Sequence, residues 1–109
     1  MKGQDPFLDA WKAVVLIIGP ELFGPGDPLT AISKNELRPL KDVVDNAFGT
    51  MSHGERRFLC AALSFYNSRW ADQLAERAGN GRTICDLLCD LDGDWQGIIF
   101  RLVRTYRGW

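Results

Sequence analysis

The sequence has no long apolar run. No purely apolar stretch is longer than Ala13–Ile18, which is far shorter than the roughly 20 residues that a membrane-spanning helix needs. The opening residues, MKGQDPF, lack the apolar segment of a signal peptide. There are only three cysteines, an odd and low number that is typical of reduced thiols rather than of a disulfide framework. We therefore predict a cytoplasmic protein with no membrane contact.

An excess of charge of either sign is also lacking. The chain has 13 Lys and Arg against 14 Asp and Glu, so its formal net charge is −1. A protein with so small a net charge has no overall field that attracts nucleic acid or an anionic membrane surface. The small net charge does not exclude a local basic patch.

Motifs of catalysis are missing as well. The chain contains no Walker A loop, G-x-S-x-G elbow, H-E-x-x-H helix or G-x-G-x-x-G turn. The single histidine, His53, is expected at a helix N-terminus beside Glu55, where the helix dipole disfavours a protonated imidazole. We predict that the protein is not an enzyme and that it has no catalytic residues and no cofactor.

Helical periodicity is what the sequence does have, over a length of 109 residues that suits one domain, 1–109. No strand is expected, because the alternation of a half-buried strand is absent. A loop rich in Gly and Pro is expected at 19–28. The pattern predicts an all-α, single-domain bundle of about five helices, at approximately 6–19, 36–48, 53–78 (with a bend near 68 left open), 83–91 and 95–107.

Capping residues support several of these boundaries. Asp5 before Pro6 is a typical N-cap, and Ser52 with Glu55 forms a capping box. Asp94 is expected to cap the last helix. Gly79 is expected to end the helix before it.

The segment TICDLLCDLDGD, residues 83–94, raises two metal hypotheses. Cys85 and Cys89 share a helix face, but a structural zinc needs four ligands, and the remaining candidates, Cys60 and His53, belong to another helix. We expect both cysteines to pack as small hydrophobic residues beside a leucine stripe. Calcium is disfavoured too, because Trp95 stands where an EF-hand needs Gly. We predict no metal site.

The same segment follows LAERAGNGR, which resembles the turn of a helix-turn-helix. The residues after Gly79 are Asn80-Gly81, where such motifs have an apolar residue. The second helix would present Asp86 and Asp90 to a polyanion, although Arg82 and the C-terminal arginines offset them in part. Nucleic-acid binding through residues 70–90 and the C-terminal arginines is therefore the alternative and less favoured hypothesis.

Two segments exceed what a bare helical bundle needs. One is the apolar excess of the first helix with its following loop, and the other is the C-terminal FRLVRTYRGW, whose Arg, Tyr and Trp are typical of binding hot spots. The last residue either folds back on the bundle or meets a partner. We predict a non-enzymatic adapter, regulator or inhibitor that binds another protein, with a homodimer through helix 6–19 as one form of this. The candidate partner-binding residues are Leu16, Ile17, Leu22, Phe23, Arg101, Arg104, Arg107 and Trp109.

Overall fold

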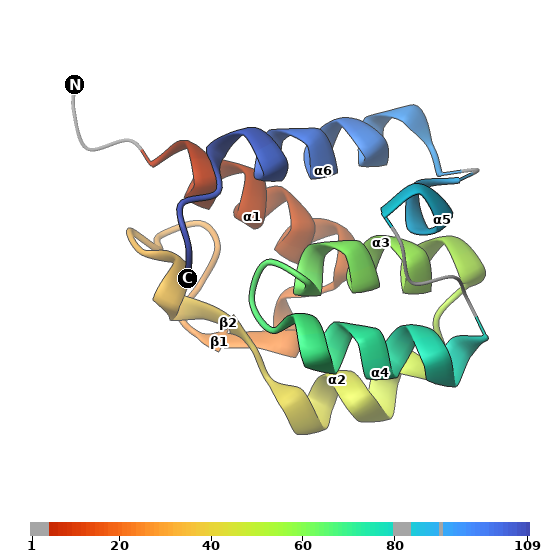
Figure 1. Ribbon diagram of the computed structural model, residues 1–109. Coiled ribbons are helices and arrows are strands. Elements are labelled where there is room, and N and C mark those ends of the chain that lie inside the picture. The colour runs from red at the N-terminus through yellow and green to blue at the C-terminus, as the bar shows by residue number, and fades with distance from the viewer. Residues whose placement is uncertain (1–4, 80–83, 90) are drawn as a thin grey trace.

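Two long helices that are distant in sequence form the upper layer of the molecule (Figure 1). The computed structural model describes residues 5–79, 84–89 and 91–109. Helix α1, Pro6–Ile18, lies against α6, Gly93–Thr105. The two helices run antiparallel, so that the N-terminal end of α1 meets the C-terminal end of α6.

Local capping explains where α1 begins. Oδ1 of Asp5 accepts hydrogen bonds from the amides of Phe7 and Leu8, at 3.0 and 3.2 Å, and so satisfies amides that the helix itself leaves without an acceptor. The helix ends at Gly19, whose φ of 132° few other residues adopt. The first predicted helix is thus confirmed to within one residue.

A small sheet follows α1, where no strand was expected. After the 3₁₀ turn η1, Pro20–Leu22, the strand β1, Phe23–Pro25, pairs antiparallel with β2, Leu37–Pro39. The indole Nε1 of Trp11 donates a 2.8 Å hydrogen bond to the buried carbonyl of Leu37 and so ties the sheet to α1. Strands of three residues are too short to show an alternating pattern, which is why the sequence did not reveal them.

The pairing of β2 shortens the predicted helix 36–48. Its first residues form the end of a second 3₁₀ turn, η2, Lys34–Glu36, and then β2, so that α2 begins only at Lys41 and spans Lys41–Phe48. Pro39, which falls inside the predicted helix 36–48, is the last residue of the strand β2.

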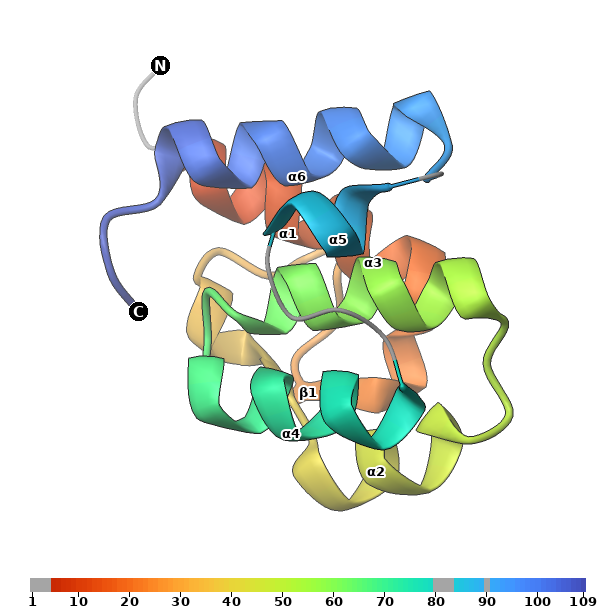
Figure 2. The same cartoon turned by 45° about the vertical axis from the view of Figure 1, so that its right-hand side comes forward.

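Helix α3, His53–Leu63, lies at the centre of the fold. Figure 2 shows it between the α6–α1 layer above and α4 and α2 below. It contacts α1, α4, α5 and α6, and every residue from Phe58 to Leu63 is buried. The predicted capping box is confirmed, with Ser52 and Glu55 bonded in both directions.

The predicted range 53–78 contains two helices, and the bend that was left open near 68 is a break just before that residue. A turn at residues 64–66 separates α3 from α4, Ser68–Ala78, and Asn67 caps the second helix by accepting from the Trp70 amide at 3.0 Å. Gly79 ends α4 with a φ of 73°, as expected of a glycine C-cap.

The fifth predicted helix is shorter than its predicted range, and the last one is shifted toward the N-terminus. Helix α5 spans Ile84–Leu88 within the predicted 83–91, of which residues 83 and 90 lie outside the described part. The last helix begins two residues before the predicted 95, because Asp92 and not Asp94 is its cap: Oδ1 of Asp92 accepts from the amide of Asp94 at 2.8 Å. The prediction of a mostly helical chain is confirmed, and none of the helices in the described ranges combines the length and apolar character needed to cross a membrane.

Candidate interaction surface on helix α6

The outward face of α6 combines apolar and cationic side chains. Ile99 and Leu102 are fully buried and fix which side of the helix faces inward. Successive residues turn by about 100° around a helix. Phe100 therefore points away from the buried side of α6, and Val103 lies at the edge of that buried side. Phe100 is 54% exposed and Val103 is 55% exposed. Such exposure of large apolar groups on a regular helix is a candidate contact surface.

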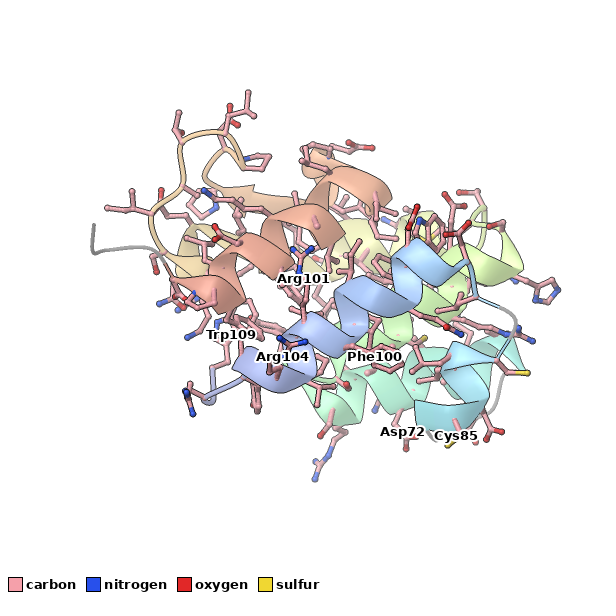
Figure 3. All side chains as sticks on the ribbon, turned by 90° about the horizontal axis from the view of Figure 1, so that it is seen from above. Asp72, Cys85, Phe100, Arg101, Arg104 and Trp109 are labelled. Atoms are coloured by element: carbon pink, nitrogen blue, oxygen red, sulfur yellow. The ribbon has the colours of Figure 1, made fainter. Side chains whose placement is uncertain are left out.

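Three arginines extend this face toward the C-terminus. Arg101, Arg104 and Arg107 are exposed, and within residues 5–79, 84–89 and 91–109 none of them forms an ion pair. In Figure 3 Arg101 lies on the α1 side of α6, whereas Phe100 lies on the side of α4 and α5. The guanidinium groups of the three arginines are therefore available to a carboxylate on another molecule.

A shallow pocket accompanies the arginines on the α1 side. It has a volume of about 310 Å³ and is lined by Arg101, Arg104 and Thr105 of α6 and by Pro6 and Asp9 of α1. Two arginines of the predicted site, Arg101 and Arg104, are thus brought together, with Asp9 as the one carboxylate among the described lining residues, whereas Arg107 does not line the pocket.

Trp109 folds back onto the globule. Its ring meets those of Trp11 and Tyr66 edge-on, both at 4.9 Å between centroids, and its Nε1 donates to Oδ1 of Asn35 at 3.1 Å. The ammonium of Lys34 lies 5.7 Å from the ring centroid. Of the two alternatives for this residue, the structure shows the docked tail, so we do not count Trp109 among the free contact residues.

The four apolar candidates around the end of α1 do not form one surface. Leu22 and Phe23 are each only 4% exposed, because η1 and β1 turn them inward and the ring of Phe23 packs edge-on against Trp11. They belong to the core, and their assignment to a partner-binding surface is corrected here. Ile17 is half-buried against the core, whereas Leu16 is 57% exposed.

Sequence reasoning missed several exposed apolar residues. Val103 and Tyr106 continue the helical spacing of the buried Ile99 and Leu102, yet they are 55% and 40% exposed. Leu29 and Ile32, in the loop between the strands, are the most exposed of the large apolar residues described, at 81% and 87%. The helical period alone separates Phe100 from the buried Ile99, whereas no local pattern marks Leu29 or Ile32.

The thiols divide into one buried and two exposed groups. Cys60 lines a pocket of about 410 Å³ with Ser64, Ser68 and Asp72, but burial raises the pKa of its thiol to about 12, so it is not a nucleophile at neutral pH. Cys85 and Cys89 are exposed, which contradicts the expectation that they pack as small hydrophobic residues. Among the described residues, no group of three His, Cys, Asp or Glu could hold a metal ion.

The hypothetical helix-turn-helix is described only in part. Helix α4, Gly79 and the five residues of α5 are seen, and Cys85 and Asp86 are exposed on α5. Arg82, Asn80-Gly81 and Asp90 lie outside the described residues. Comparisons with protein-family models, with curated proteins and with solved structures found no match.

Proposed function

We propose that this chain is a non-enzymatic protein that acts by binding another protein through the outward face of α6. The observation that carries the proposal is the pairing of Phe100 and Val103, each more than half exposed, with arginines that form no ion pair in the described structure. A few residues carry most of the binding energy at protein interfaces, and Trp, Tyr and Arg are enriched among them. An adapter, regulator or inhibitor would use such a face.

The site is built on regular secondary structure. All of its side chains except Arg107 stand on a regular 13-residue helix, whose inner face is anchored by the buried Ile99 and Leu102. A preorganised surface avoids part of the entropy that binding otherwise costs. The matching partner surface offers an apolar hollow for Phe100 and carboxylates for the arginines.

Nucleic acid is the second candidate, because three arginines within seven residues, without an ion pair to any described residue, also suit phosphate groups. The exposed apolar side chains favour the protein partner, since phosphate contacts do not need them. Self-association through α1 finds less support, because Leu16 is its only large apolar residue that is exposed.

A photo-crosslinking experiment in the native host tests the proposal. A benzophenone amino acid placed at position 100 is expected to capture a partner, whereas the same residue at Val43, which is 40% exposed on α2, is not. Arg104→Glu should abolish capture, and Arg69→Glu, a charge reversal on the exposed surface of α4, should leave it intact. Equal capture from positions 100 and 43, or capture that ignores Arg104→Glu, would contradict the proposal.

A gel shift with duplex DNA separates the two candidates. Retention at low salt that is lost with Arg104→Glu but unaffected by Phe100→Ala would favour nucleic acid. Loss of protein binding with both variants, and no shift of DNA, is the expected result.

A further inference from the structure

The loop between β1 and β2 carries two aliphatic side chains, Leu29 and Ile32, that are exposed to solvent while hydrogen bonds constrain the loop backbone. Oδ1 of Asp27 accepts from the Leu29 amide at 2.8 Å, and Oε2 of Glu36 accepts from the amides of Ile32 and Ser33, at 2.9 and 3.1 Å. Ala31, between the two exposed residues, is only 3% exposed and anchors the loop in the core. The loop therefore displays Leu29 and Ile32 on a hydrogen-bonded frame, which differs from a loose loop that could fold them inward.

An apolar pocket is lined in part by Leu29. It has a volume of about 430 Å³, and its walls come from the end of α1, from η1 and from the start of the loop. The lining residues are Leu16, Pro20, Glu21, Gly26, Asp27, Pro28 and Leu29. This volume accommodates a large aliphatic or aromatic side chain together with neighbouring groups of the same segment.

The charge of the pocket has one sign. Glu21 and Asp27 are both exposed, and none of the described Lys or Arg residues lines the pocket. Glu36, which accepts from two loop amides, does not line it. An apolar floor with carboxylates at its rim suits an apolar group that carries a cation close by.

We propose that this pocket is a second docking site, which takes a segment of a partner protein that presents a large apolar side chain flanked by Lys or Arg. A protein segment fits better than a small molecule, because a ligand confined to the pocket would leave Ile32, 87% exposed, uncovered. A membrane surface fits poorly, because the rim carboxylates would be repelled by anionic lipids. With the oppositely charged face of α6, the chain would have two different docking surfaces, as an adapter requires.

The test is a titration of the ¹⁵N-labelled full chain with a synthetic peptide, followed by NMR. The probe is a capped peptide with a central Leu-Leu flanked by two Arg on each side, and its matched control has Glu in place of every Arg. The Arg peptide is expected to shift the amides of residues 16, 21, 22, 26, 27 and 29–32, with weaker binding at higher salt. Equal shifts with both peptides, or shifts that lie only elsewhere, would overturn the proposal.

Single substitutions in the chain measure how much each residue contributes to binding of the Arg peptide. Leu29→Ser removes an exposed side chain and should lower the affinity for the Arg peptide by roughly tenfold, as expected for a contact at the centre of a site. Asp27→Asn keeps Oδ1 as the acceptor for the Leu29 amide but removes the charge, and should weaken binding roughly two- to fivefold, as should Glu21→Gln. Val43→Ser, on α2, is the control and should bind as the unchanged chain does.

Two further outcomes would count against a separate partner. If the same amides shift with protein concentration when no peptide is present, the occupant is a second copy of this chain. If Leu29→Ser and Val43→Ser bind the Arg peptide equally well, the pocket is not the site. Neither result bears on the face of α6, which the crosslinking at position 100 tests independently.

Discussion

The indole Nε1 of Trp70 donates a 2.9 Å hydrogen bond to Oδ1 of Asp45, and so joins α4 to α2. The other carboxylate oxygen accepts from Nζ of Lys41 at 2.8 Å. Burial by itself raises the pKa of Asp45, but the hydrogen bonds from Lys41 and Trp70 outweigh it, so that the pKa lies below its ordinary value of 3.8. A carboxylate with a lowered folded pKa stabilises the fold above its unfolded pKa, and this contribution is lost as the pH falls through the folded value.

Asp45→Asn tests this contribution, because the amide keeps an oxygen for Trp70 and loses only the charge. At pH 7 we expect a loss of less than about 1 kcal/mol in the free energy of unfolding, since the carboxylate is partly exposed and screened. The difference from the unchanged chain should disappear once the pH falls below the lowered folded pKa. Urea unfolding at pH 7 and in acid measures it, with Asp42→Asn on the exposed side of α2 as the control. A difference that persists unchanged into acid would argue that the charge is not responsible.

The docked tail gives a second prediction. Trp109→Ala removes the edge contacts with Trp11 and Tyr66 and the hydrogen bond to Asn35. We expect the free energy of unfolding to fall by about 2 kcal/mol, roughly half the loss for a fully buried tryptophan. Arg107→Ala, two residues earlier and exposed, should stay within about 0.5 kcal/mol. Similar small effects of the two variants in urea unfolding would show that the tail is not docked in solution.

Local signals predicted the helices better than they predicted the sheet and the surfaces. Asp5 and Ser52 mark helix starts because their hydrogen bonds reach only two or three residues along the chain. The strands depend on pairing Phe23 with Pro39, sixteen residues apart, and no single window of sequence contains that contact.

The same distinction explains the candidate surfaces. Phe23 and Leu29 are both apolar residues of one Gly- and Pro-rich region, yet Phe23 is 4% exposed and Leu29 is 81% exposed. Phe23 is buried because it reaches Trp11, a contact that depends on the tertiary fold. The exposure of the C-terminal arginines could be predicted from their charge alone. That they form no ion pair could be recognised only once the positions of all the described carboxylates were known.

Two adjacent residues of α6 test the assignment of its inner and outer faces. Ile99 is fully buried and Phe100 is 54% exposed. Ile99→Ala should reduce the free energy of unfolding by about 2–5 kcal/mol through a lost core contact and the resulting cavity. Phe100→Ala, although it removes the larger side chain, should change it by less than about 1 kcal/mol, which denaturant unfolding of both variants would measure. A reversed order would mean that the helix is rotated about its axis.

Thiol reactivity provides the last prediction, because the three cysteines differ in both exposure and ionisation. Burial raises the pKa of Cys60 to about 12, so that at pH 8 only about one thiol in ten thousand is ionised at this site. Cys85 and Cys89 are exposed. Ellman's reagent should therefore modify two thiols rapidly in the folded chain and the third only after guanidinium is added. The double variant Cys85→Ser/Cys89→Ser should show no rapid phase while folded and one thiol when unfolded, whereas a rapid phase in this variant would place Cys60 at the surface and contradict its burial in α3.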